Sequence, residues 1–74
     1  MTPVTAPTIA RLKGRPRMWA YRRLVAGKYG PVIRRRGRWQ YVDLAAVEQA
    51  EGMTFPADRL VEAGVHIREA EHGR

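Results

Sequence analysis

Two clusters of arginine hold the side chains of this sequence that are best suited to binding chemistry. The first is the run Arg34-Arg35-Arg36-Gly37-Arg38, and the second is the pair Arg22-Arg23. A guanidinium group donates hydrogen bonds in a planar fork that matches phosphate oxygens and the edge of guanine. Four arginines around one glycine would repel each other on a free surface. We therefore interpret the first cluster as a phosphate or minor-groove contact.

Charge is divided unevenly along the chain. The net charge is +7, yet residues 1–42 contain eleven lysines and arginines and no acid, whereas residues 43–74 contain three arginines and seven acids. The two parts therefore carry +11 and −4. A generic solvated surface mixes both signs, so the exclusion of acids from the first part favours a polyanionic partner. Because we expect no acid near Arg22 or Arg23, we interpret that pair as a DNA contact rather than as a solvated helix face.

Side chains that would support catalysis or bind a metal are scarce. The chain has no cysteine and no serine, and His66 and His72 are too far apart to suggest a metal site. No glycine-rich phosphate-binding loop follows a predicted strand. We therefore expect a protein that is not an enzyme and uses no cofactor. No apolar run reaches the ~20 residues of a membrane span, and no secretory signal is present, so we expect a cytoplasmic protein without a membrane partner.

Two short helices must position the Arg22-Arg23 pair. The pattern of residues 5–14 predicts the first helix, and the turn Gly14-Arg15-Pro16 follows it. A second helix is predicted over about residues 17–26. Two short helices joined by a tight, glycine-containing turn are typical of a helix-turn-helix, whose second helix enters a major groove.

Both faces of the predicted second helix carry large side chains at helical spacing. We expect the apolar face to pack on the first helix and the opposite face to offer its arginines to a ligand. Trp19 belongs to the outward set, but we expect it to be partly core rather than base-stacking. The inward set is Met18, Tyr21, Leu24 and Val25, and the outward set is Trp19, Arg22, Arg23 and Ala26.

A β-hairpin is predicted to carry the four-arginine run at its tip. Residues 32–34 form its first strand and residues 38–42 its second, with the turn at Arg36-Gly37. Trp39 and Tyr41 share one face of the second strand. We expect this aromatic face to cover the helices, because a two-stranded hairpin is unstable alone.

Asp43 is predicted to cap a third helix over residues 44–51, which Gly52 ends. Residues 1–5 are expected to be a loose lead-in. The predicted fold is therefore α+β: a small winged helix-turn-helix of three short helices with a two-stranded β-hairpin wing.

The remaining residues, 53–74, are predicted to leave this domain as a C-terminal tail. The domain proper would then be residues 1–52, a winged-helix DNA-binding domain. A short helix is predicted at residues 57–63, and residues 65–67 alternate like a strand. The apolar side chains of the tail either add to the small core or meet a partner. They are Phe55, Leu60, Val61, Val65 and Ile67.

Four short motifs occur in a distinctive order within residues 5–52. They are Arg15-Pro16-Arg17, Tyr21-Arg22-Arg23-Leu24-Val25, Pro31-Val32, and Gly37-Arg38 followed by Tyr41-Val42-Asp43-Leu44. In this order they resemble the small winged-helix excisionases of temperate phages (recombination directionality factors), which are related in fold to the MerR-type DNA-binding domain.

The resemblance implies a protein that binds double-stranded DNA, self-associates on it and bends it. It implies that the helix at residues 18–26 enters the major groove and that the hairpin at residues 34–38 is the wing. It further implies a role in DNA recombination, in which the tail contacts a site-specific integrase and directs it toward excision. The setting would be the nucleoid of a bacterium or a phage-infected host cell.

The predicted DNA contacts fall into three groups. The recognition helix supplies Arg17, Trp19, Arg22 and Arg23; the wing supplies Arg34, Arg35, Arg36 and Arg38; and Arg11, Lys13, Arg15 and Lys28 contact the DNA backbone. Two alternatives stay open. One is a small transcriptional regulator of the same fold, with the tail as a dimerisation segment. The other is an RNA-binding basic protein.

Overall fold

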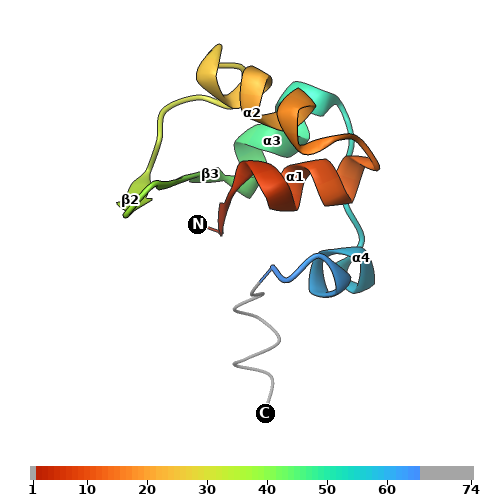
Figure 1. Ribbon diagram of the computed structural model, residues 1–74. Helices are drawn as coiled ribbons and strands as arrows, with labels where there is room; N and C mark the ends of the chain where they lie inside the picture. Colours follow the sequence, from red (N-terminus) through yellow and green to blue (C-terminus); the bar gives the residue numbers. More distant parts are fainter. Residues whose placement is uncertain (1, 66–74) are drawn as a thin grey trace.

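The computed structural model describes residues 2–65. In this part the chain forms four helices and a three-stranded antiparallel sheet (Figure 1). The predicted α+β class is confirmed; the structure adds a strand at residues 3–4 to the predicted two, and its fourth helix lies within the short helix predicted at residues 57–63. The elements are β1 (Pro3–Val4), α1 (Ala6–Lys13), α2 (Arg17–Val25), β2 (Arg34–Arg36), β3 (Trp39–Asp43), α3 (Leu44–Glu51) and α4 (Ala57–Glu62).

Glycines end the first and third helices where the sequence pattern predicted. Gly14 after α1 has a φ of 66° and Gly52 after α3 has a φ of 68°. This left-handed conformation carries little penalty only for a residue without a Cβ atom. After Gly14, the N–H of Arg15 donates to the carbonyl oxygen of Ala10 at 2.9 Å. This bond satisfies a carbonyl group that the helix itself would leave without a donor.

The sheet has the order β1-β3-β2, so β3 is its central strand. β1 pairs antiparallel with β3, and Val4 lies opposite Val42. The prediction of a loose lead-in over residues 1–5 is therefore wrong for Pro3 and Val4, which form a strand. The N-terminal residues pair with the edge of β3 that β2 does not cover, and this contact joins residues too distant in sequence for a local pattern to indicate.

Asp43 occupies the N-cap position of α3, as predicted, but its side chain makes no capping hydrogen bond to the helix. Its carboxylate instead accepts a hydrogen bond from the backbone N–H of Thr2 at 3.3 Å. The backbone N–H of Leu44 donates to the carbonyl oxygen of Thr2 at 2.8 Å. The start of α3 is thus fastened to the N-terminal strand.

The hairpin turns one residue later than predicted. Arg36 lies opposite Trp39, so the two turn residues are Gly37 and Arg38 rather than Arg36 and Gly37. Gly37 has a φ of 60°, whereas no residue other than glycine has a positive φ in the described part of the chain. Glycine at the first position of a two-residue turn is typical of the type II′ turns that match the twist of a hairpin.

The face of β3 that packs on the helices is the opposite of the predicted one. Val42 is fully buried, whereas Trp39 is 42% exposed and Tyr41 is half-buried. Side chains alternate between the faces of a strand, so burying Val42 turns the aromatic pair to the other face.

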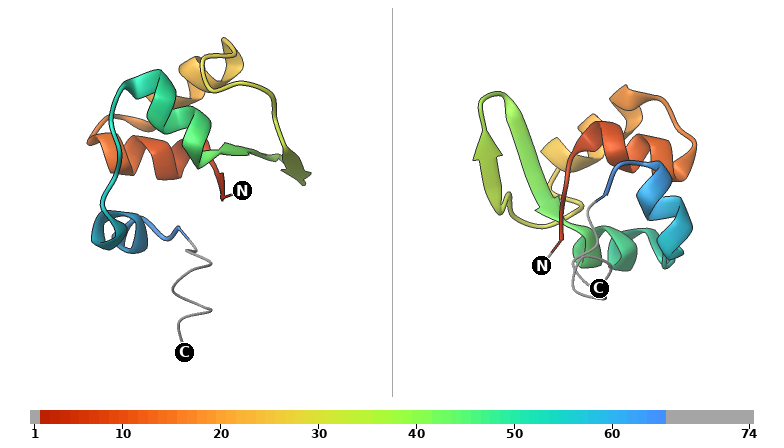
Figure 2. Two further views of the ribbon diagram at one scale, coloured as in Figure 1. Left: turned by 180° about the vertical axis from the view of Figure 1, so that it is seen from behind. Right: turned by 90° about the horizontal axis from the view of Figure 1, so that it is seen from below.

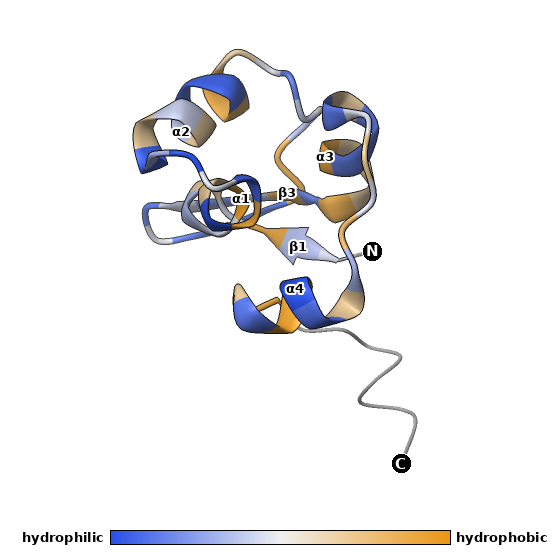
Figure 3. Cartoon of the chain, turned by 90° about the vertical axis from the view of Figure 1, so that its right-hand side faces the viewer, coloured by the Kyte–Doolittle hydropathy of each residue, from blue (hydrophilic) through white to orange (hydrophobic). Residues whose placement is uncertain are grey.

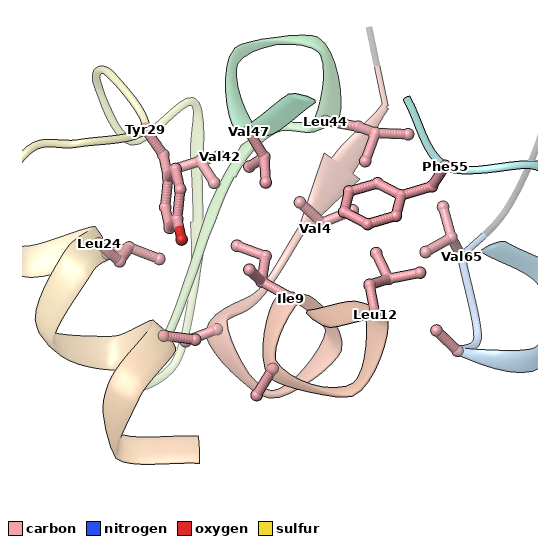
Figure 4. Close-up of a cluster of buried hydrophobic side chains, with 14 of the residues drawn as sticks. Val4, Ile9, Leu12, Leu24, Tyr29, Val42, Leu44, Val47, Phe55 and Val65 are labelled. Carbon is pink, nitrogen blue, oxygen red and sulfur yellow. The ribbon is translucent and has the colours of Figure 1, made fainter. Parts of the chain in front are cut away.

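The core lies between the helices and the sheet. Tyr29, Ile9, Val42 and Val47 are its largest fully buried side chains. Figure 4 shows Tyr29 beside Val42 and Val47, with Phe55 at the other end of the cluster. Tyr29 comes from the loop after α2, which the sequence analysis treated only as a break between elements.

The helix α2 packs through a different face from the one we predicted. Ala20 and Leu24 are buried, whereas Met18, Tyr21 and Val25 are 55%, 52% and 64% exposed. Only Leu24 of the predicted inward set is therefore correct. The small side chain of Ala20 fills the inward position, and a search for large apolar residues does not select it.

The residues after α3 contribute to the same core. Phe55, Leu60 and Val65 are buried, whereas Val61 on α4 is 60% exposed. Core packing, one of the two alternatives for the tail, is therefore correct for the first three. Ile67 and most of the predicted third strand lie outside the described residues. In the described part of the chain, no helix is long and apolar enough to cross a membrane.

Candidate nucleic-acid interface

A groove of about 340 Å³ lies between α2 and the hairpin. Arg17, Met18 and Tyr21 line it from α2, and Arg38 and Trp39 line it from the hairpin. Leu24, Gln40 and the start of α1 also line it. The hairpin extends away from the helices in both views of Figure 2, so it flanks the groove as a separate wall. The structure thus brings the second helix and the arginine run to one surface, which we call the α2–hairpin groove.

The tip of the hairpin is entirely cationic and exposed. Arg34, Arg35 and Arg36 form the short strand β2, and all three are exposed. Arg38 is exposed in the turn, with its guanidinium carbon 5.4 Å from the centroid of the Trp39 ring. Figure 3 shows the corresponding hydrophilic colour of the hairpin. Within residues 2–65, none of these four arginines forms an ion pair.

The exposed face of α2 combines apolar and cationic side chains. Arg17 and Arg22, two of the residues predicted to contact DNA from this helix, are exposed. Met18, Tyr21 and Val25 are exposed on the same helix. Residues three, four and seven positions apart share one face of a helix, so Met18, Tyr21, Arg22 and Val25 form one strip along α2.

Arg23 differs from its neighbour Arg22 because it is tied into the fold. Its Nε donates to Glu51 Oε2 at 2.8 Å and to the hydroxyl oxygen of Tyr29 at 3.1 Å. The hydroxyl of Tyr29 donates to the same carboxylate oxygen at 2.8 Å. Lys13 Nζ lies 3.6 Å from Glu51 Oε1. The premise that no acid lies near Arg23 is therefore wrong, and we call these four residues the Glu51 cluster.

The Glu51 cluster shifts the pKa of its members. Burial opposes ionisation of Glu51, but hydrogen bonds from Tyr29 and Arg23 and the charges of Arg23 and Lys13 outweigh it, so the pKa of Glu51 lies below its usual value. Burial and the hydrogen bond to Glu51 raise the pKa of Tyr29 to about 12. At neutral pH the carboxylate is therefore charged and the phenol protonated, which is the arrangement that the hydrogen bonds require.

Trp19 is half-buried and packs against the core, in agreement with the expectation that it is partly core. The guanidinium carbons of Arg15 and Arg23 lie 5.6 and 5.0 Å from the centroid of its ring. These are cation–π distances. Trp19 therefore connects the Glu51 cluster to the start of α2, and it does not line the α2–hairpin groove.

The four residues predicted to contact the DNA backbone lie in different surroundings. Arg11 donates to a carbonyl oxygen at the end of α4 at 3.4 Å, and Lys13 is paired with Glu51. Arg15 and Lys28 are exposed. The structure therefore does not gather this group on one surface, and the first two face α4 and the Glu51 cluster.

Most acids of the described chain accept hydrogen bonds within the fold. Asp43, Glu48 and Glu51 each bind an N–H group from another segment. Asp58 and Glu62 are exposed on α4, which lies on the opposite side of the fold from α2 (Figure 1). Among the residues that the structure describes, the charged side chains lining the α2–hairpin groove are therefore all cations, Arg17 and Arg38.

Two parts of this surface were missed by sequence reasoning. Met18 and Tyr21 were assigned to the core, although Ala20 and Leu24, four positions apart, offered an alternative inward face. Glu51 was treated only as the end of a helix. It lies 28 positions from Arg23, and no local pattern connects the two residues.

Comparison of the chain with protein-family models, with curated proteins and with solved structures finds no match in any of the three. The functional conclusion therefore depends on the charge and geometry of the α2–hairpin groove and its walls.

Proposed function

We propose that this protein binds duplex DNA as a small winged helix-turn-helix protein. The helix α2 enters the major groove, and the hairpin is the wing that contacts the neighbouring backbone. The observation that carries this proposal is the position of two cationic elements on either side of one groove, while the acids lie elsewhere. A duplex offers a matching surface, because its major groove admits a helix and phosphates line both of its edges.

The number of exposed arginines gives the expected salt dependence. Arg17 on α2 and the four arginines of the hairpin would neutralise about five phosphates, with a contribution of about 0.9 to the salt slope from each. Affinity should then fall by about 500-fold between 50 and 200 mM salt. This loss is large enough to distinguish a phosphate-binding surface from a nonpolar one.

The two walls of the groove would have different roles. Arg22 projects from the exposed face of α2, where a guanidinium group can bind a guanine edge. Arg36 lies in the hairpin, where contact with phosphate fixes position without reading sequence. Arg23 is held by Glu51 and would act through the position of α2 rather than through the bases.

The biological role that we propose follows the resemblance to phage excisionases. Such a protein would bind neighbouring sites cooperatively, bend the DNA and direct an integrase toward excision. The helix α4 lies away from the α2–hairpin groove and exposes Val61, Asp58 and Glu62 (Figure 1). We assign the contact with the integrase, or with a second copy of the chain, to this helix.

Selection of duplexes from a random pool, followed by gel-shift titration, tests the DNA proposal. Arg22→Ala should relax sequence preference, whereas Arg36→Ala should weaken all duplexes to a similar extent. Arg22→Lys keeps the charge and removes the planar fork, so it should resemble Arg22→Ala in specificity. Ala57→Glu on α4 changes the net charge by the same amount as either arginine-to-alanine substitution and should change affinity less than either of them.

Two outcomes would contradict the proposal. One is a duplex affinity that does not depend on salt. The other is a preference for structured RNA over every selected duplex in direct competition, which would favour the RNA-binding alternative.

A further inference from the structure

The strip along α2 carries three of the six large apolar side chains that are exposed in the described part of the chain, namely Met18, Tyr21 and Val25. All three side chains are more than half exposed, although the opposite face of the helix, with Ala20 and Leu24, is already packed. Single exposed apolar residues are ordinary, but neighbouring ones on one element mark a contact surface. Something other than the core of this chain is therefore expected to cover the strip.

The surroundings of the strip restrict what can cover it. It continues into the α2–hairpin groove, where Met18 and Tyr21 share the lining with Trp39. Arg17 and Arg38 line the same groove, and Arg22 stands within the strip. A purely apolar partner would bury these guanidinium groups without compensation, which is unfavourable. The matching ligand is a polyanion that presents apolar groups between its charges.

Duplex DNA has this chemistry in its major groove. The phosphates carry the charge, and the C5-methyl group of thymine is the apolar group on the base edges. A helix lying in the groove brings one face against these edges. On α2 that face is the side away from the core, where three of the four residues of the strip are apolar.

We propose that Met18, Tyr21 and Val25 read thymine methyl groups and that Arg22 is the one polar base reader among the four residues of the strip. The target sites would then be defined mainly by the positions of their thymines. This inference depends on the proposed DNA-binding function and adds the base edges that the protein recognises.

Replacing thymine with deoxyuridine in a selected duplex tests the inference. Each replacement removes one methyl group and leaves charge and hydrogen-bonding groups unchanged. Affinity should fall about fourfold for each contacted thymine, the ratio expected for burial of one methyl-sized group. Duplexes with cytosine at the same positions should bind weakly. Duplexes with 5-methylcytosine there should recover part of the affinity, because the methyl group is restored.

Substitutions in the protein connect the effect to the strip. Val25→Ala and Met18→Ala should reduce the discrimination between thymine and deoxyuridine at particular positions. Met53→Ala is the matched control for Met18→Ala, because Met53 is also an exposed methionine, at 41%, but lies between α3 and α4. The discrimination should be the same in Met53→Ala as in the unsubstituted protein.

The possible results separate this inference from the function on which it depends. Salt-dependent binding of selected duplexes without loss on deoxyuridine replacement would overturn the inference and leave DNA binding intact. Failure to bind any duplex would overturn both. A dimer in solution that Val25→Glu disrupts and Val61→Glu does not would assign the strip to contact between copies, and would also overturn the inference.

Discussion

The Glu51 cluster and the tip of the hairpin both concentrate positive charge, but only the cluster compensates it. In the cluster, one carboxylate of 7% exposed side-chain area accepts hydrogen bonds from Arg23 and Tyr29 and lies near Lys13. At the tip, four arginines are exposed without an acidic partner among residues 2–65. Arginine in the cluster stabilises the fold, whereas arginine at the tip raises the free energy of the unbound protein until an anion arrives.

The adjacent residues Arg22 and Arg23 show the same difference within a single helix. A shift of one position turns a side chain by more than a quarter of a circle about the helix axis. Arg23 therefore meets Glu51, while Arg22 faces solvent. Neighbouring residues of one type can thus have different roles, and the helix face on which each lies decides between them.

Neutralising the hairpin tip should give the largest effect. Replacing Arg34, Arg35 and Arg36 together with glutamine should lower duplex affinity about 100-fold at 0.15 M salt and reduce the salt slope by about 2.7. The free energy of unfolding should stay the same or rise, because repulsion between the three cations is removed. Gel shifts and urea unfolding of the same variant measure both quantities. A stability loss without an affinity loss would show that the tip has a structural role.

Removing the charge of Glu51 should have the opposite signature. Glu51→Gln should lower the free energy of unfolding by about 1–3 kcal/mol, because Arg23 and Lys13 lose a charged acceptor. Glu62→Gln on the exposed face of α4 is the matched control and should change stability by less than about 0.5 kcal/mol. Equal effects of the two substitutions in urea unfolding would remove the structural distinction between the cluster and the surface.

The Glu51 cluster should make the free energy of unfolding depend on pH in both the acid and the alkaline range. Because folding lowers the pKa of Glu51, its contribution is present above the usual carboxyl pKa and is lost as the pH falls through the lowered value. Because folding raises the pKa of Tyr29 to about 12, its contribution is present below the usual tyrosine pKa of 10.0 and is lost as the pH rises toward 12. Urea unfolding across the pH range measures both losses of stability, which we call the acid limb and the alkaline limb.

Two substitutions assign these limbs to their residues. Glu51→Gln should flatten the acid limb, and Tyr29→Phe should flatten the alkaline limb at a loss of about 1 kcal/mol at neutral pH. If both limbs persist unchanged in these variants, groups outside the cluster control the pH dependence.

The smallest expected effect comes from the turn of the hairpin. Gly37→Ala should lower stability by about 1 kcal/mol, because its φ of 60° is unfavourable for a residue with a Cβ atom. Arg38→Ala at the next turn position, whose φ is not positive, should leave stability nearly unchanged and weaken DNA binding. Thermal unfolding of the two variants measures the effect of the turn conformation on stability, and gel shifts measure the effect of the lost charge on DNA binding. Equal stability losses would contradict this assignment of the turn.

Local chemistry predicted the ends of the elements better than their orientation. Gly14 and Gly52 end helices because a left-handed residue is needed there, and this requirement is visible in the sequence. The inward face of α2 was not visible, because large apolar residues recur on both sides and the inward position is filled by Ala20. The strand β1 was missed because its two residues, one of them proline, gain their order only from β3.

The candidate interface was predictable in its charge and not in its apolar part. The arginines of the hairpin are exposed, as the expected repulsion between them required. Arg23 could not be separated from Arg22, because the distinction depends on a carboxylate 28 positions away. The groove joins residues of α2 to Arg38 and Trp39 of the hairpin, which lie far from α2 in the sequence, so no local pattern indicates it.

The two ends of β3 are supported differently, because β1 pairs only with its last residues. The base of the hairpin, at Val42 and Asp43, is held by the N-terminal residues. Val4 pairs with Val42, and the backbone N–H of Thr2 donates to the side chain of Asp43. The tip of the hairpin has only β2 beside it. Within the described residues, the outer part of β3 is therefore supported by one neighbouring strand, whereas its base is held by β1 and by Thr2. In the DNA complex that we propose, this difference would let the arginines adjust to a curved backbone while α2 keeps its place.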